Sequence, residues 1–406
     1  MKTAGIIGCL PKYNLITIIQ GGDTFMPCKK KTSLMVILVF LITLFTPAML
    51  YADTVDVKAE AYVLMDADSG KVLLAANEHK RLAPASMTKL MTLILAVEDL
   101  QNGKVSLKDK VVTSEEAWKM GGSQIYLEPG EEMTYEDMLI AIAVGSANDA
   151  CVAVAEHLEG THKNFVERMN REAKMLGLKD THFVNSYGLS ASGHYSSAYD
   201  MAVIARHALN YPKILEYTSI KEYSLRQGEF KLYNTNKLLW WYQGADGFKT
   251  GWTNEAKYCL TSTAKRDGLR LIGAVLASPE KHGNFRDTMK LFNYGFARYG
   301  FKNITPRGTV CGVVKIGKGI RENVEVVAEE DVGAIVKKGD EKKIKAELVL
   351  SDYVDAPVKK GQKLGEYLVY NNGQLYKEVN LLATQDVPRA GLIKQIMKML
   401  GETYLL

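Results

Sequence analysis

The segment APASMTKLMTLILA, residues 83–96, places a lysine three positions after a serine, at the start of an apolar run. The residues that follow Lys89 are strong helix formers and predict a helix buried in a core. At this spacing Ser86 and Lys89 lie on one helical face, close enough to touch. A serine hydroxyl needs a base to become a nucleophile, and burial can lower the pKa of a lysine enough to make it one. Ser86 is therefore a candidate nucleophile and Lys89 its candidate base, although a capping serine before a surface lysine gives the same spacing.

A second motif lies in VGSANDACVAVAEHL, residues 144–158, where Ser146 and Asn148 lead into another predicted helix. The Ser146 hydroxyl can relay a proton toward a leaving amine. The Asn148 side chain can form hydrogen bonds with a substrate amide. Both residues are therefore candidates for the site that contains Ser86.

The third motif, Lys249-Thr250-Gly251, lies on a predicted strand within GFKTGWTNEAKYCL, residues 247–260. Lys249 and Thr250 offer a cation and a hydroxyl to a terminal carboxylate. Gly251 would let a substrate backbone approach the strand closely. The order SxxK, SxN, KTG is the signature of class A β-lactamases and penicillin-binding proteins, which indicates acyl transfer through a serine.

Segments outside these motifs predict the architecture. Residues 54–76 predict two strands around a turn at Asp68-Ser69-Gly70, and helical patterns dominate from Met87 to about His207. Three more strands are expected at 244–253, 256–268 and 270–278, followed by a helix at 284–300. Strands on both sides of a helical middle favour one sheet covered by helices, an α+β domain of the α/β type.

The C-terminal part has a different pattern. Short alternating segments predict a small all-β domain, with a hairpin at Asn372-Gly373. Residues 388–406 predict an amphipathic helix whose lysines oppose its apolar face, so it could lie on a membrane surface or dock on the protein itself.

Residues 1–52 have the layout of a secretory signal peptide, with lysines before the apolar residues 34–45 and small residues before Ala52. Met26 is an alternative start. We thus expect a signal region at 1–52, a catalytic domain at 53–302, a β-rich domain at 303–387 and a membrane-associating helix at 388–406. The net charge is +5, of which the five lysines and one aspartate of residues 1–52 supply +4. The remaining +1 does not favour a nucleic-acid partner.

Several longer stretches carry a family resemblance: RLAPASMTKLMT (81–92), GGSQIYLEPGEEMTYEDMLIAIAVGSANDACVAVAEHLEG (121–160), HFVNSYGL (182–189), HYSSAYDMAVIARHAL (194–209) and DGFKTGWTNEAKYCL (246–260). In these the chain resembles the serine-type D-alanyl-D-alanine carboxypeptidases, the low-molecular-mass penicillin-binding proteins. The resemblance covers most of 55–300. The later β region and the terminal helix look like the stalk domain and membrane anchor of this family.

The resemblance implies a DD-peptidase/β-lactamase-like catalytic domain that uses no metal or cofactor. Ser86 would attack the carbonyl between the last two D-alanines of a peptidoglycan stem pentapeptide, with Lys89 as general base. The backbone N–H groups of Ser86 and Trp252 would form the oxyanion hole. β-Lactams would be covalent inhibitors. The enzyme would work on the outer face of the cytoplasmic membrane, attached through its terminal helix.

Two alternatives belong to other functional classes. A class A β-lactamase would carry an aspartate in place of Ala147 and an E-x-x-L-N segment, which does not occur between 149 and 248. A non-catalytic penicillin-binding sensor or scaffold would have no need of intact Ser86, Lys89, Ser146 and Lys249.

Four further residues receive structural interpretations. Ser197 and Asp200 fit a helix-capping box better than a catalytic pair. His157 and His162 are interpreted as helix-surface residues because their spacing does not suit a metal site. Arg286 lies two residues from Asn284, where the family carries an arginine, so a role in carboxylate binding is left open.

Overall fold

The structure, a computed structural model, describes residues 55–393 and 395. The expected signal peptide lies outside these residues, as does most of the expected terminal helix. Among the described residues, no helix is both long and apolar enough to span a membrane.

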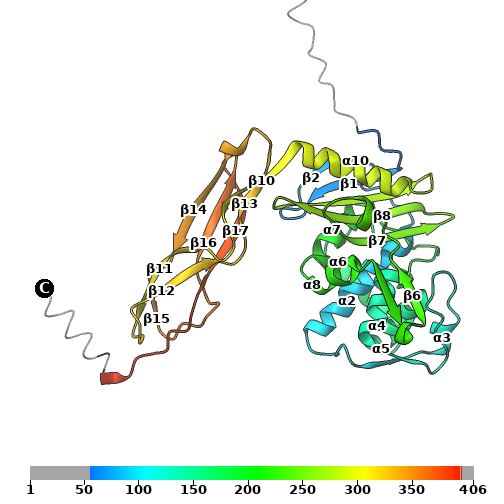
Figure 1. The fold of residues 1–406 in the computed structure, drawn as a ribbon, viewed down its shortest axis with the longest axis horizontal. Coiled ribbons are helices and arrows are strands. Elements are labelled where there is room, and N and C mark those ends of the chain that lie inside the picture. The colour runs from blue at the N-terminus through cyan, green and yellow to red at the C-terminus, as the bar shows by residue number, and fades with distance from the viewer. Residues whose placement is uncertain (1–54, 394, 396–406) are drawn as a thin grey trace, which may run out of the picture. The chain divides into compact units, whose positions relative to one another are not determined.

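A five-stranded sheet in the order β2-β1-β9-β8-β7 forms the centre of the catalytic part (Figure 1). Its strands are β1 (Ala61–Asp66), β2 (Val72–Ala76), β7 (Ala245–Thr253), β8 (Lys257–Arg266) and β9 (Leu269–Ser278). All neighbouring pairs are antiparallel. Strands from the two ends of the catalytic part therefore share one sheet, as the sequence predicts. The sheet ends at β7, which leaves one side of this strand without a strand partner.

Both faces of the sheet are buried because its side chains alternate between two hydrophobic cores. On β1, Val63 and Met65 pack into the core shared with most of the helices, whereas Leu64 packs into the core shared with α10. This alternation follows from the two-residue repeat of a strand. The helix α10 (Gly283–Arg298) thus lies on one face, and most of the other helices lie on the opposite face (Figure 1). The short helix α9 (Leu238–Trp241) belongs to the α10 side, because its Leu238 packs into the same core.

The opposite face carries the helical middle of the chain. Its helices are α2 (Lys89–Gln101), α3 (Glu115–Trp118), α4 (Tyr135–Ile140), α5 (Asn148–Glu159), α6 (His162–Met175), α7 (Ala198–Ala208) and α8 (Pro212–Ser219). Two short strand pairs interrupt this part and were not predicted. They are β3 (Lys110–Val112) with β4 (Glu132–Thr134), and β5 (Glu222–Leu225) with β6 (Phe230–Tyr233).

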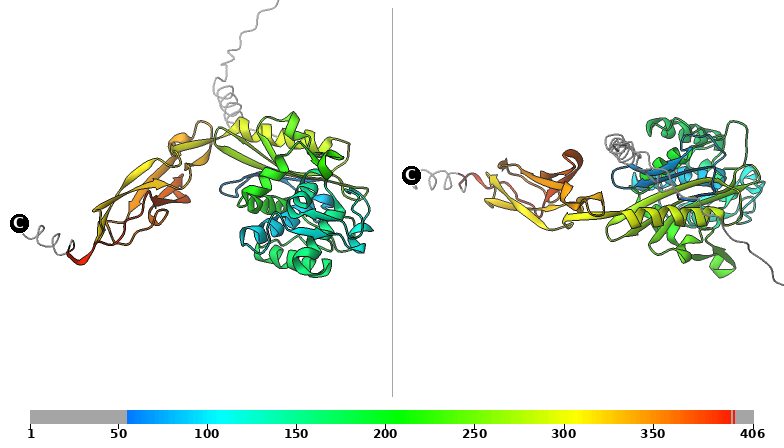
Figure 2. Two further views of the ribbon diagram at one scale, coloured as in Figure 1. Left: turned by 60° about the horizontal axis from the view of Figure 1, so that its bottom comes forward. Right: turned by 90° about the horizontal axis from the view of Figure 1, so that it is seen from above.

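The C-terminal part is all-β, so the predicted fold class is confirmed. Its strands are β10 (Tyr299–Thr305), β11 (Val310–Gly317), β12 (Asn323–Ala328), β13 (Val332–Lys337), β14 (Ile344–Leu350), β15 (Tyr353–Asp355), β16 (Lys363–Asn371) and β17 (Gln374–Ala383) (Figure 2). Six of them form a sheet in the order β14-β16-β17-β12-β11-β15, and β10 pairs with β13. The predicted hairpin joins β16 to β17, with positive φ angles of 54° at Asn372 and 79° at Gly373.

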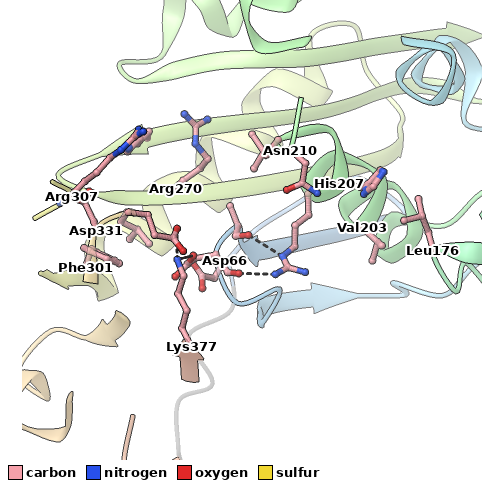
Figure 3. Close-up of a pocket in the computed structure, with 18 of the residues that line it drawn as sticks. Asp66, Leu176, Val203, His207, Asn210, Arg270, Phe301, Arg307, Asp331 and Lys377 are labelled. Atoms are coloured by element: carbon pink, nitrogen blue, oxygen red, sulfur yellow. Dashed lines mark hydrogen bonds and ion pairs between the residues drawn. The ribbon is translucent and has the colours of Figure 1, made fainter. Parts of the chain in front are cut away.

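A cavity of about 840 Å³ lies beside the turn that follows β1 (Figure 3). Lys377 donates hydrogen bonds to Asp68 at 2.5 Å and to Glu330 at 2.8 Å. The Tyr376 hydroxyl donates to Asp66 at 2.8 Å. These contacts join β17 to the turn after β1, and they leave Lys377 with two carboxylate partners.

Candidate active site

Ser86 lies on a 3-10 turn, η1 (Ala85–Thr88), that leads directly into α2. Two glycines from distant segments press against this turn. A Cβ atom on Gly188 would lie 2.0 Å from the carbonyl oxygen of Ala85, and one on Gly251 would lie 2.7 Å from that of Pro84. Both distances are too short for any side chain. Gly251 therefore makes room for the protein's own nucleophile turn and not, as predicted from the sequence, for a substrate backbone.

Lys89 is fully buried at the first position of α2. Its Nζ atom lies 3.0 Å from Ser86 Oγ, so the predicted contact between the two side chains is present. The amine also donates to Asn148 Oδ1 at 2.6 Å and to the carbonyl oxygen of Tyr187 at 2.5 Å. Burial lowers the pKa of Lys89 to about 8, because a buried ammonium loses its hydration. A neutral amine can therefore form near physiological pH.

Three acceptors around Lys89 suit both of its protonation states. The ammonium has three hydrogens and can donate to all three oxygens. The neutral amine has two hydrogens for Asn148 and Tyr187, which leaves its lone pair directed at Ser86. The serine hydroxyl can then rotate to donate its own proton to Nζ. This is the geometry that a general base requires.

Asn148 begins α5, and its side chain is held on both sides. Its Oδ1 atom accepts from Lys89, and its Nδ2 atom donates to the carbonyl oxygen of Gly121 at 2.6 Å. Its backbone N–H donates to the carbonyl oxygen of Ser123 at 2.7 Å. The loop at 121–123 therefore fixes Asn148, which in turn orients Lys89. One Nδ2 hydrogen remains for a ligand.

Ser146 follows a π-helical turn, η2 (Ala141–Gly145), in a left-handed conformation with a φ of 62°. It is buried, with 4% of its surface exposed, and lies two residues before Asn148. A non-glycine residue in this conformation carries backbone strain, which is common where a side chain is aimed at a functional site. Ser146 thus lies in the chain next to Asn148, which contacts Lys89, and it remains a candidate for this site.

Lys249 is the second buried lysine of this site, with 1% of its surface exposed. Its Nζ atom has no hydrogen-bond partner in the described part of the chain. Burial and the nearby charge of Lys89 lower its pKa to about 7. An unpaired buried amine is costly, so an anionic ligand that reached Nζ would be strongly favoured.

Thr250 and Trp252, which follow on β7, are more exposed than Lys249. Thr250 donates its hydroxyl hydrogen to Thr235 Oγ1 at 2.7 Å. Trp252 is 54% exposed, and its ring centroid lies 6.2 Å from that of Tyr258 on β8. Because Gly251 packs against the nucleophile turn, the backbone of Trp252 lies close to that of Ser86. Their N–H groups are therefore suitable candidates for a shared oxyanion hole.

Of the residues predicted to have structural roles, Ser197 and His157 behave as expected and His162 does not. Ser197 caps α7 by accepting a hydrogen bond from the backbone of Asp200 at 3.1 Å, which confirms its capping role, whereas the Asp200 carboxylate accepts from Asp180 and Thr181. His157 is exposed, as predicted. The surface prediction is wrong for His162, whose side chain is only 12% exposed and contacts Ser186 Oγ at 3.0 Å. Its ring also stacks on Tyr187, which helps to hold the loop that carries the Tyr187 carbonyl.

Arg286, in the first turn of α10, forms an ion pair with the exposed Glu280. Asn284, where the family carries an arginine, is buried and donates to the carbonyl oxygen of Cys259 at 3.0 Å. Among the described residues, no group of three or more histidine, cysteine, aspartate or glutamate side chains could hold a metal ion.

Sequence reasoning missed three contributors to the site. Tyr187 and Gly121 act through backbone carbonyls, which any residue type supplies, so no side-chain pattern identifies them. Thr235 precedes the KTG motif by fourteen residues and belongs to the segment Asn234-Thr235-Asn236. That run of polar residues directly before an apolar helix was the available signal.

A buried lysine within hydrogen-bond distance of a serine is the arrangement expected of a serine hydrolase with an amine base. Comparisons with known proteins agree. Residues 48–280 match the D-alanyl-D-alanine carboxypeptidase family, and residues 299–389 match the C-terminal domain of penicillin-binding protein 5. The D-alanyl-D-alanine carboxypeptidase DacF of Bacillus subtilis (strain 168) is 43% identical over 350 residues, which cover 85% of this chain and 90% of that protein.

Solved structures point the same way. Penicillin-binding protein 5 from Haemophilus influenzae is 34% identical with a TM-score of 0.64, and the match covers 82% of this chain and 98% of that one. Penicillin-binding protein D2 from Listeria monocytogenes, in its ampicillin-bound form, is 33% identical with a TM-score of 0.55 and coverages of 60% and 99%. The chain belongs to the serine-type D-alanyl-D-alanine carboxypeptidase family of penicillin-binding proteins.

Proposed function

We propose that this chain removes the terminal D-alanine from peptidoglycan stem pentapeptides through an acyl-enzyme on Ser86. The observation that carries the proposal is the 3.0 Å contact between Ser86 Oγ and the buried amine of Lys89. The same nucleophile would open β-lactams, and the Listeria relative in its ampicillin-bound form supports this extension.

In the acylation step, Ser86 Oγ forms a bond to the carbonyl carbon of the penultimate D-alanine, and its proton moves to Lys89. The backbone N–H groups of Ser86 and Trp252 stabilise the oxyanion. The carbon–nitrogen bond then breaks, and the leaving amine takes the proton through Ser146. Water attacks the resulting ester and releases the shortened peptide and free Ser86.

Through Lys249, a bound substrate could change the pKa of the general base Lys89. In the free enzyme the charge of Lys89 disfavours the charged form of Lys249, and neither amine has a hydrogen-bonded carboxylate among the described residues. A substrate carboxylate beside Lys249 would stabilise its ammonium and raise its pKa. The ammonium so formed would lower the pKa of Lys89 through repulsion. Substrate binding would thus place the proton on Lys249 and leave Lys89 neutral.

The division of the chain into a signal region, a catalytic domain at 53–302, a stalk at 303–387 and a surface helix at 388–406 remains part of this proposal. Leu392 and Ile393 are 77% and 81% exposed, which supports an apolar face that contacts a membrane. Deletion of 388–406 should release the exported protein from membranes without changing kcat on a soluble peptide. Continued sedimentation of the truncated protein with membranes would contradict this.

The decisive experiment measures D-alanine released from a synthetic stem pentapeptide by the purified protein. Multiple turnovers that disappear after preincubation with a β-lactam are expected. Labelling by a fluorescent penicillin without D-alanine release would instead indicate a non-catalytic penicillin-binding module, and rapid β-lactam hydrolysis without D-alanine release would indicate a β-lactamase.

A further inference from the structure

The hydroxyl groups of Thr235 and Thr250 form a pair at the open side of β7. Their Oγ1 atoms are 2.7 Å apart, and both residues are partly exposed. We propose that Thr235 is a positioning residue that holds the Thr250 hydroxyl toward a bound carboxylate and thereby selects substrates with a free C-terminus. The proposal rests on the function proposed above.

Two buried asparagines fix the position of Thr235. Asn234 and Asn236 are both 0% exposed. Asn234 Nδ2 donates to the carbonyl oxygens of Thr218 and Ile220 at 3.0 and 2.8 Å. Asn236 Nδ2 donates to the carbonyl oxygen of Gly247 on β7 at 3.0 Å. The segment is therefore tied to β7 itself, and the Thr235 hydroxyl has a defined place beside the strand before any ligand arrives.

The number of hydroxyl hydrogens explains why Thr235 and Thr250 together would bind a carboxylate better than Thr250 alone. Each threonine hydroxyl has one hydrogen and two lone pairs. In the pair, one hydrogen lies between the two oxygens and the other is free. When a carboxylate binds, the Thr250 hydrogen can turn to it while Thr235 donates to Thr250 Oγ1. Such a chain of donors polarises the last hydrogen bond and strengthens it.

The orientation of the Thr250 hydroxyl is important because the nearby cation gives a carboxylate little directional preference. Lys249 supplies the cation, but an ammonium on a flexible stem is a point charge with little directional preference. Arg286, the arginine considered from the sequence, forms its ion pair with Glu280 instead. The Thr250 hydroxyl then gives the carboxylate a directional donor, and the anchored Thr235 hydroxyl orients it.

The test compares Thr235→Val with the wild-type enzyme on two tripeptides, diacetyl-L-lysyl-D-alanyl-D-alanine and its C-terminal amide. Valine keeps the shape of threonine and leaves both asparagine anchors intact. For the free acid, KM should rise about tenfold with kcat unchanged, the loss expected when one supporting hydrogen bond is removed. For the amide, both constants should stay within twofold. Thr235→Ser, which restores a hydroxyl, should restore the low KM.

Thr113→Val is the matched control, because the Thr113 hydroxyl is buried without a hydrogen-bond partner and its loss should change neither substrate's constants. An equal loss on both tripeptides, or a loss that Thr235→Ser does not reverse, would overturn the role of Thr235. A Thr235→Val enzyme with wild-type preference for the free acid would do the same. Failure of the wild-type enzyme to release D-alanine would overturn the proposed function instead, so the two failures are distinguishable.

Discussion

Two largely buried lysines of this molecule differ in whether they have hydrogen-bond partners. Lys377, beside the cavity of Figure 3, donates to the carboxylates of Asp68 and Glu330, and these partners raise its pKa. Lys249, in the candidate active site, has no hydrogen-bond partner among the described residues, and burial lowers its pKa to about 7. The two side chains are 18% and 1% exposed, respectively.

The difference separates structural charge from functional charge. A paired cation stabilises the folded state, because its removal would leave carboxylates without a partner. An unpaired buried cation weakens the folded state, and it persists where a ligand supplies the missing partner. The following predictions test that contrast, beginning with the nucleophile on which the active-site assignment depends.

Ser86→Ala should abolish both D-alanine release and β-lactam acylation, because the hydroxyl that forms the ester is gone. Release of D-alanine from a pentapeptide and mass spectrometry of the β-lactam-treated protein would measure the two losses. A melting temperature close to that of the wild type would serve as the folding control. Multiple turnovers by this variant would remove the basis for the active-site assignment.

Lys89→Met should reduce the rate of acylation by roughly 10²–10⁴-fold, the usual contribution of general base catalysis. Stopped-flow measurement with a chromogenic β-lactam would give the rate. Lys377→Met is the matched control, since it removes a largely buried lysine that lies outside the site, and it should acylate at the wild-type rate. Similar acylation rates for the two variants would mean that Lys89 is not the base.

Lys249→Met should affect catalysis and stability in opposite directions. The kcat/KM for free-acid peptides should fall by about 10- to 100-fold, while amidated peptides should change much less. The free energy of unfolding at pH 7 should rise by roughly 1–3 kcal/mol, because an unpaired buried cation is replaced by an apolar side chain. Chemical denaturation would measure this gain, and a large loss of stability would contradict the contrast with Lys377.

The pH dependence of kcat/KM should reveal which lysine does what. Lys89 acts as a base only when neutral, so activity should rise with pH through its pKa of about 8. Lys249 attracts a carboxylate only when charged, so free-acid binding should weaken about tenfold per pH unit above its pKa of about 7. The free acid should therefore give a bell-shaped profile, and the amide should lose the alkaline limb. Identical profiles for both substrates would exclude a role for Lys249 in carboxylate binding.

The smallest effect is expected at Lys377. Lys377→Met should lower the free energy of unfolding by about 1 kcal/mol, because Asp68 and Glu330 lose their shared partner. The kcat and KM on a soluble pentapeptide should stay within twofold of the wild type. A stability gain like that expected for Lys249→Met would show that pairing does not distinguish the two lysines.

The sequence predicts the large elements of the fold because their patterns are repetitive and long. Strands β7, β8 and β9 and helix α10 were found within a few residues of their bounds. The pairs β3–β4 and β5–β6 were missed because strands of three or four residues are too short to show an alternating pattern. In such short pairs tertiary packing decides the local structure.

The site was predictable where chemistry depends on side chains and unpredictable where it depends on backbone. Ser86 and Lys89 come from one motif and Asn148 from another, and the structure joins them by direct contacts. The Tyr187 carbonyl, which orients Lys89, has no sequence signature because every residue has a backbone carbonyl group. The burial of His162 was also hidden, since its partner Ser186 lies far along the chain.

The nucleophile turn, held between Gly188 and Gly251, restricts how this enzyme could adapt to new inhibitors. A side chain at either position would displace the backbone that carries Ser86, so escape variants at the two glycines would sacrifice the nucleophile's placement. The exposed Trp252 has no such constraint on its side chain, because only its backbone borders the turn. Selection under a bulky β-lactam would therefore be expected to collect changes at the rim around Trp252 and to leave the glycines untouched.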